Sequence, residues 1–167
     1  MMKLRELRGR RRDDGAAAVE FAFIAPLLIF LLLAIVGYGY MLSFRQAMSQ
    51  AASEGARAAA VAPAGVPQAA AGGADSISTR AIDAINQGLG GYGVTCTSGG
   101  VLERNGTAAG TCVVTFTSAC SASSTGATCA KVALDYAYKD NSLLPSFPGL
   151  GIVLPSSLAY TAEVELS

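Results

Sequence analysis

A run of 24 residues without a charged side chain, from Phe21 to Phe44, constrains this chain more than any other feature. As an α-helix rising about 1.5 Å per residue, the run is long enough to cross a hydrocarbon core of roughly 30 Å. A cleaved signal peptide has an apolar region of only about 7–15 residues followed by a small-residue cleavage site, whereas this run is longer and contains Pro26. We therefore expect a transmembrane helix, which we place at residues 16–42.

The charges on the two sides of this run differ in sign. Residues 1–15 carry six basic and three acidic side chains, a net charge of +3, and the rest of the chain carries −3, because the whole chain sums to zero. Basic flanks of membrane helices stay in the cytoplasm. We therefore expect a single-pass inner-membrane protein with a cytoplasmic N-terminus and with residues 43–167 in the periplasm or outside the cell.

The composition argues against most enzyme classes. The chain has no histidine, which removes Ser–His and Cys–His nucleophile pairs, histidine zinc sites and the commonest general base. Nucleophile-elbow, P-loop and S-x-x-K motifs are absent from the sequence as well. Charged residues make up 14%, too few for a basic nucleic-acid-binding surface. We expect no catalytic activity, no cofactor, no metal and no nucleic-acid partner.

The junction between the basic segment and the apolar run contains Gly15, Ala16 and Glu20. An acid at the edge of a membrane span is costly, so it suggests a function. If the chain were cut after Gly15, the new α-amine of Ala16 would lie near the Glu20 carboxylate, in the same chain or in a neighbour, and pairing would lower the cost of both charges. Alternatively, Glu20 lies at headgroup depth in the first turn of a helix, where the macrodipole favours an acid.

This combination resembles the type III signal of type IV prepilins: a basic leader, a glycine at the cut, a glutamate five residues later and an apolar helix. A membrane prepilin peptidase recognises that signal on the cytoplasmic face. More narrowly, the segment Gly15–Phe21 followed by Pro26, together with the stretch Gln50–Ala60, is similar to the TadE-like proteins of the tight-adherence (Tad, or Flp) pilus system. The strand pattern near the C-terminus is more loosely similar to that family.

The resemblance implies a function in pilus assembly. Residues 1–15 would be a removable leader, Gly15 and Ala16 the processing site, and Glu20 and Phe21 the residues that dock onto other subunits. The implied partners are the membrane, a prepilin peptidase, other Tad pilus subunits and inner-membrane platform proteins. Major Flp pilins are much shorter and typically have Tyr where this chain has Phe21, which favours a minor pseudopilin. TadF-like and TadG-like proteins, and a signal-anchored binding module unrelated to pili, are the alternatives.

Residues 43–167 are expected to form an α+β domain that resembles the pilin plan of a long helix on a sheet. Small and apolar positions recur with helical spacing in residues 43–61, which indicates that the membrane helix continues and packs on its own domain rather than on another subunit. A second helix is expected from Asp75 or Ser76 to Gly88. Alternating apolar residues predict four strands of an antiparallel sheet, at residues 92–96, 112–116, 132–138 and 158–166.

The four cysteines all lie in the exported part, and none forms a C-x-x-C pair. Disulfides are therefore a better interpretation than zinc ligation. Four cysteines allow three connectivities, and the sequence does not choose among them. We favour Cys96 with Cys112, which share the inward face of a predicted hairpin, and Cys120 with Cys129, which would close a Ser/Thr/Ala-rich loop. Each bridge would contribute about 2–4 kcal/mol.

Three connecting segments have competing interpretations. The segment Gly88–Gly93 matches the dinucleotide fingerprint in form, but it follows a helix, so we interpret it as a turn. Asn105–Thr107 matches a glycosylation pattern and is more simply an Asn-Gly turn. The loop Asn141–Pro155 has seven large aliphatic or aromatic residues, and either covers the open side of the core, which we favour, or docks a partner.

Overall fold

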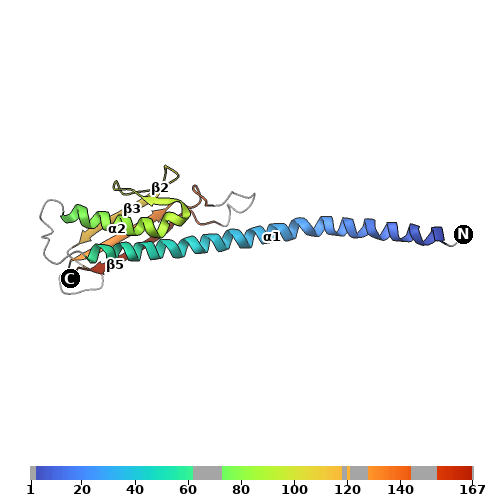
Figure 1. The fold of residues 1–167 in the computed structure, drawn as a ribbon, viewed down its shortest axis with the longest axis horizontal. Helices are drawn as coiled ribbons and strands as arrows, with labels where there is room; N and C mark the ends of the chain where they lie inside the picture. The colour runs from blue at the N-terminus through green and yellow to red at the C-terminus, as the bar shows by residue number, and fades with distance from the viewer. Residues whose placement is uncertain (1–2, 62–72, 118–119, 121–127, 144–153, 167) are drawn as a thin grey trace. The chain divides into compact units, whose positions relative to one another are not determined.

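The computed structural model describes residues 3–61, 73–117, 120, 128–143 and 154–166. They divide into two compact units, Met1–Tyr40 and Met41–Ser167, which are described separately below. The helices are α1 (Lys3–Ala60), α2 (Gly73–Leu89) and the short 3-10 helix η1 (Gly90–Tyr92). The strands are β1 (Val94–Cys96), β2 (Val101–Arg104), β3 (Thr107–Thr117), β4 (Cys129–Tyr136) and β5 (Leu158–Glu165) (Figure 1).

The predicted long N-terminal helix is confirmed. α1 contains the span that we placed at residues 16–42, continues past residue 43 to Ala60 as expected, and also includes the leader from Lys3 onward. The leader is rich in Arg and Leu, which are strong helix formers. Pro26 lies inside α1, where its ring cannot donate the hydrogen bond that a helical residue normally gives to the carbonyl four positions earlier.

The α+β class is also confirmed, but the expectation of about four strands was too low. The sheet has five antiparallel strands in the order β1-β2-β3-β4-β5. The missed strand is β2, whose four residues are too few for a clear alternating pattern. The Asn-Gly turn that we predicted joins β2 to β3, with φ of 51° at Asn105 and 78° at Gly106. Positive φ at both positions is typical of the tight turns that connect hairpin strands.

In the unit Met41–Ser167, α1 packs its apolar stripe against its own domain, as predicted. Phe44 is fully buried, and its ring centroid lies 5.1 Å from that of Tyr92, 5.0 Å from that of Tyr136 and 6.1 Å from that of Tyr138. The rings of Tyr92 and Tyr136 meet Phe44 edge to face, an arrangement that stabilises the rings beyond their area of burial. Other buried apolar residues of this part of α1 are Met41, Met48, Ala51, Ala52, Ala56 and Ala59.

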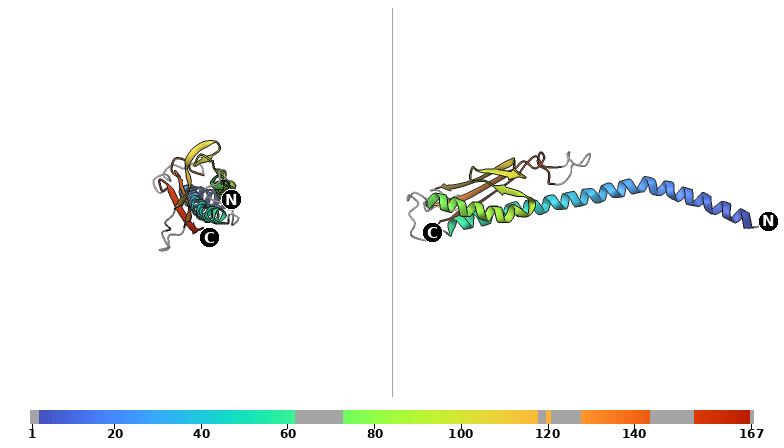
Figure 2. Two further views of the ribbon diagram at one scale, coloured as in Figure 1. Left: turned by 90° about the vertical axis from the view of Figure 1, so that its left-hand side faces the viewer. Right: turned by 45° about the horizontal axis from the view of Figure 1, so that its top comes forward.

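Glycines allow α1 and α2 to approach closely. A Cβ at Gly55 would lie 2.8 Å from the side chain of Ile85, and a Cβ at Gly88 would lie 3.0 Å from the Cβ of Ala51. Larger residues at these two positions would therefore push the helices apart. A further cluster of Ala59, Ile77, Ala81 and Ala130 joins both helices to the sheet. The two helices lie side by side along one face of the sheet (Figures 1 and 2).

The apolar loop at residues 141–155 falls mostly outside the described residues. Its role as a cover or as a docking patch therefore stays a prediction. Leu143, at the start of this loop, is buried. The segment Gly88–Gly93, which we interpreted as a turn, contains the end of α2, the helix η1 and a left-handed Gly93 with φ of 69°. Gly93 leads directly into β1.

Candidate functional site

The residues predicted for processing and docking lie within two turns of α1, in the unit Met1–Tyr40. Gly15, Ala16, Glu20 and Phe21 are all exposed. Because Ala16 and Glu20 are four positions apart on a helix, they lie on the same face, one turn from each other. A cut before Ala16 would therefore create the new amine one helical turn from Glu20.

The fold gives no packing reason for a glycine at position 15. A Cβ built on Gly15 meets no atom within 4 Å, and α1 continues through this position with regular helical structure. A glycine inside a helix weakens it by about 1 kcal/mol relative to alanine. Gly15 therefore lowers the stability of α1 around the bond that precedes Ala16.

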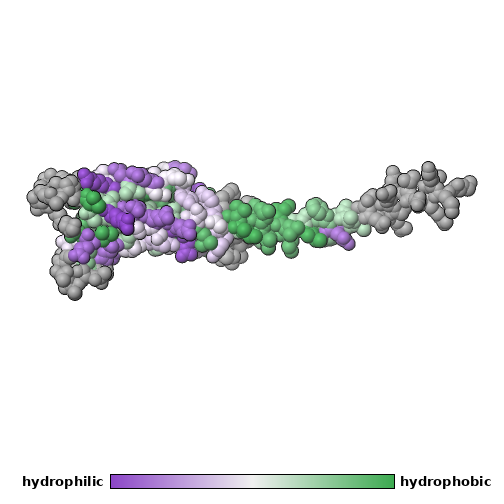
Figure 3. Space-filling view, turned by 60° about the horizontal axis from the view of Figure 1, so that its bottom comes forward, coloured by the Kyte–Doolittle hydropathy of each residue, from purple (hydrophilic) through white to green (hydrophobic). Residues whose placement is uncertain are grey.

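The helix that follows is apolar on every side. Large side chains from Val19 to Tyr38 are exposed, and Phe21 and Phe23 reach 70% and 79% exposure. Figure 3 shows a continuous apolar surface along this part of α1. Among the described residues one helix, Gly15–Ala60, is long and apolar enough to cross a membrane, and none of its most apolar window is buried within the protein. A helix with no polar side needs lipid or other helices around it.

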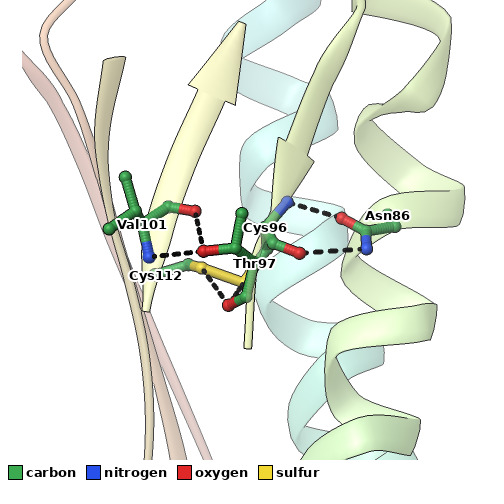
Figure 4. The surroundings of a disulfide bond; sticks show 5 residues. All are labelled: Asn86, Cys96, Thr97, Val101 and Cys112. Atoms are coloured by element: carbon green, nitrogen blue, oxygen red, sulfur yellow. Dashed lines mark hydrogen bonds between the residues drawn. A yellow bond between two sulfur atoms is a disulfide. The ribbon is translucent and has the colours of Figure 1, made fainter. Parts of the chain in front are cut away.

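The first disulfide lies at the end of β1, in the unit Met41–Ser167. Cys96 is joined to Cys112 of β3, the pairing that we favoured, with Cα atoms 6.0 Å apart. The side-chain amide of Asn86 on α2 accepts a hydrogen bond from the Cys96 N–H at 2.6 Å and donates one to the Cys96 carbonyl at 3.1 Å (Figure 4). Asn86 therefore bonds the backbone N–H and C=O of Cys96 as a neighbouring strand would.

The second disulfide joins Cys120 to Cys129, again the pairing that we favoured. The Glu163 carboxylate and the two sulfurs lie within 4.8 Å of one another. Such a cluster resembles a metal site in its residue types. However, both sulfurs are committed to the disulfide, so neither is the thiolate that zinc would need. We interpret this cluster as a structural disulfide that links the start of β4 to Cys120.

Arg104 organises a second polar centre at the end of β2. Its guanidinium donates hydrogen bonds to the carbonyls of Asn141, Ser142 and Leu143. The hydroxyl of Tyr136 donates to the Asn141 carbonyl at 2.8 Å. Burial raises the pKa of Tyr136 above its ordinary value, and the nearby charge and hydrogen bond of Arg104 act in the opposite direction. This network fixes the chain between β4 and β5 at its first residues.

The predicted site residues thus form two groups. The processing and docking residues lie together in the first unit, and the four cysteines lie as two separate pairs in the second. Asn86 and Arg104 were not predicted from the sequence. An asparagine near a helix end and one arginine in a short strand give no signal in a single sequence, because their partners are backbone groups.

These features define a class: a protein with one N-terminal helix able to cross a membrane, followed by a disulfide-bonded α+β domain. Residues 15–57 match the family model described as TadE-like protein. That match confirms the resemblance over the segment that contains Gly15, Glu20 and the apolar run. It covers less than half of the 167 residues and does not include the sheet. No curated protein and no solved structure gives a significant match to the chain.

Proposed function

We propose that this protein is a minor pseudopilin that acts in the biogenesis of a Tad (Flp, type IVc) pilus. The observation that carries the proposal is the TadE-like match at residues 15–57, which begins at the glycine that the fold itself does not require. The protein has a cytoplasmic leader of residues 1–15 and an inner-membrane span. Its disulfide-bonded domain lies outside the cytoplasm, consistent with the oxidising compartments in which disulfides persist. It acts by assembly and has no catalytic activity of its own.

The first step is processing. A prepilin peptidase hydrolyses the Gly15–Ala16 peptide bond: water adds a hydroxyl group to the Gly15 carbonyl carbon, the C–N bond breaks, and the Ala16 nitrogen takes up a proton to become the new α-amine. The removed leader carries net +3, and the mature side chains carry net −3. Two features support this step: the bond is exposed, and glycine lowers the stability of the helix around it.

The second step is docking. After cleavage the Ala16 amine is one helical turn from the Glu20 carboxylate, and pairing reduces the cost of holding both charges at the membrane edge. Within one chain, the charges of the Ala16 amine and the Glu20 carboxylate neutralise each other. Between chains, Glu20 of one subunit accepts the amine of its neighbour and Phe21 contacts the neighbouring helix. The neighbours are other Tad pilus subunits and platform proteins.

The processing step is tested by co-expression with the prepilin peptidase of the same system, followed by intact mass and N-terminal sequencing of the membrane fraction. The mature chain should begin at Ala16, and Gly15→Ala should remain uncut. Gly39→Ala is the matched control, because a Cβ at Gly39 also meets no atom within 4 Å; this variant should be cut normally. A chain that retains its original N-terminus when the peptidase is active would refute the processing step.

The docking step needs a separate variant. Glu20→Ala should be cut at the normal site but should co-purify with less of its partner subunits. Glu54→Ala removes an exposed acid from the later part of α1 and should leave co-purification unchanged. Equal recovery of partner subunits with both variants would refute the role of Glu20. If the protein is instead an anchored binding module unrelated to pili, neither cleavage nor co-purification with pilus subunits will occur.

A further inference from the structure

The two edges of the sheet are treated very differently by the surrounding chain. The β1 edge is three residues long, and the N–H and C=O of its Cys96 are bonded by the Asn86 side chain. The Cys96–Cys112 disulfide fixes the same strand to β3. Short length and covering side chains are two ways in which proteins protect a sheet edge from pairing with other chains. The β1 edge is therefore closed.

Among the described residues, the β5 edge has neither the short length nor the covering side chain of the β1 edge. The strand has eight residues, and all eight are in register with β4 on one side. No described strand pairs with its other side, because β5 is the last strand in the sheet order (Figure 2). Its sequence, Leu158–Glu165, contains no proline and no lysine, two residues that commonly blunt edges, and its only charged residues are Glu163 and Glu165. A long regular edge of this kind is a template for an added strand.

The alternation of an antiparallel ladder shows which backbone groups face outward. The N–H of Leu166 bonds to the Thr128 carbonyl beside β4, so residues at even positions of β5 direct their backbone groups toward β4. The odd positions, which include Ala159, Thr161 and Glu165, direct theirs away from the sheet. The same three residues have exposed side chains.

The side chains along β5 indicate the chemistry of a matching strand. The inner face carries apolar residues such as Ala162 and Val164, and both charged residues of the strand are acidic, Glu163 and Glu165. In β4, Lys131 is the register partner of Glu163, but the partner of Glu165 is the uncharged Cys129. An added strand with apolar residues on one face and basic residues on the other would match both faces.

We propose that the β5 edge binds one extended segment of a partner protein as a sixth strand, through the backbone groups of Ala159, Thr161 and Glu165. The segment alternates apolar residues with residues that include lysine or arginine. This inference goes beyond the proposed function and does not depend on cleavage after Gly15. It gives the exported domain a docking surface of its own, separate from the membrane helix.

The test uses the full chain in detergent micelles and a fluorescently labelled synthetic peptide of about ten residues that alternates valine with lysine or threonine. Fluorescence anisotropy should show saturable binding. The matched control is the same peptide N-methylated at every second amide, on the side that would face β5. It should bind about tenfold more weakly or worse, because it has lost several backbone hydrogen bonds. Equal binding of the two peptides would overturn the proposal, as would no binding of either.

Two variants test the edge from the protein side. Thr161→Pro removes an outward N–H and should weaken binding of the unmodified peptide about tenfold, whereas Thr161→Ala should leave binding unchanged. Glu165→Gln should weaken binding up to about fivefold and reduce its salt dependence.

If the Thr161→Pro protein loses its native circular dichroism, the N-methylated peptide and Glu165→Gln still decide the question. Unaltered binding by Glu165→Gln and by a folded Thr161→Pro would overturn the proposal. Concentration-dependent dimerisation of the chain through β5, without peptide binding, would overturn it in favour of a second copy.

Discussion

The two units of the chain use apolar residues in opposite ways. In the unit Met1–Tyr40, most large apolar side chains from Val19 to Tyr38 are exposed. In the unit Met41–Ser167, the same helix alternates between a buried apolar stripe and an exposed polar side that contains Arg45, Ser49, Ser53 and Arg57. One helix therefore carries two patterns, one suited to lipid and one suited to a protein core. Large apolar residues of α1 therefore stabilise the protein core after Met41, whereas before Met41 they form a surface suited to lipid.

Phe44 and Phe21 provide the largest test of this comparison. Phe44→Ala removes a ring that is fully buried against three tyrosines, so the free energy of unfolding of the unit Met41–Ser167 should fall by about 3–5 kcal/mol. Phe21→Ala removes a ring that is 70% exposed and should leave that free energy unchanged. Denaturant titration in micelles, followed by near-UV circular dichroism, measures both. Equal effects of the two substitutions would contradict the division into two units.

The disulfides should contribute the next largest effect. Replacing Cys96 and Cys112 together by serine opens a loop with a sequence separation of 16, which should lower the free energy of unfolding by about 3 kcal/mol. The Cys120–Cys129 bridge has a separation of 9, and its removal should lower it by slightly less. The same denaturant titration compares the two double variants. Membrane association of the chain should not change, because both bridges lie outside the first unit.

Asn86 should have a smaller effect that is specific to the β1 edge. Asn86→Ala leaves the Cys96 N–H and C=O without their side-chain partners, so we expect a loss of about 2 kcal/mol in the free energy of unfolding. Amide hydrogen exchange should quicken at Cys96 more than in β4. The neighbouring exposed residue supplies the control, since Gln87→Ala should change neither measurement. Unchanged exchange at Cys96 in Asn86→Ala would show that the edge is closed by other groups.

Tyr136 should have the smallest effect and should make stability depend on pH. Burial raises the pKa of Tyr136 in the folded protein, so the neutral phenol is favoured by folding. Its contribution is complete below the unfolded pKa of about 10 and is lost as the pH rises through the folded pKa. Tyr136→Phe should lower stability by about 1 kcal/mol at neutral pH through the lost bond to Asn141. It should also reduce the decline in stability above pH 10; an identical decline would contradict the assignment.

Much of the fold could be predicted because its signals are local. The uncharged run of residues 21–44, the helical spacing in residues 43–61 and the alternation in β4 and β5 each depend on neighbouring residues. The extent of β3 was missed for a physical reason: its first half contains Ala108, Ala109 and Gly110, which are poor strand formers. Gly110 is required there because a Cβ would overlap the Asp135 carbonyl oxygen of β4. Only the assembled sheet reveals that constraint.

Less of the site could be predicted. The roles of Gly15, Ala16 and Glu20 stay predictions, and the sequence left three cysteine connectivities open, of which the structure has the one that we favoured. Asn86 and Arg104 were not identified because each binds backbone groups, and backbone groups leave no trace in a sequence. The open β5 edge was hidden for the same reason, since an edge is defined by which strand has no neighbour.

The most direct test of the central claim, that residues 16–42 cross the membrane and separate the leader from the domain that follows, is labelling with a membrane-impermeant maleimide. Three single-cysteine additions, Arg8→Cys, Ile29→Cys and Ser49→Cys, are made in a host without prepilin peptidase, where the leader is retained. With this topology, position 49 should be labelled in intact spheroplasts, position 8 only after lysis, and position 29 only in detergent. Labelling of position 8 in intact spheroplasts, or protection of position 49, would contradict it.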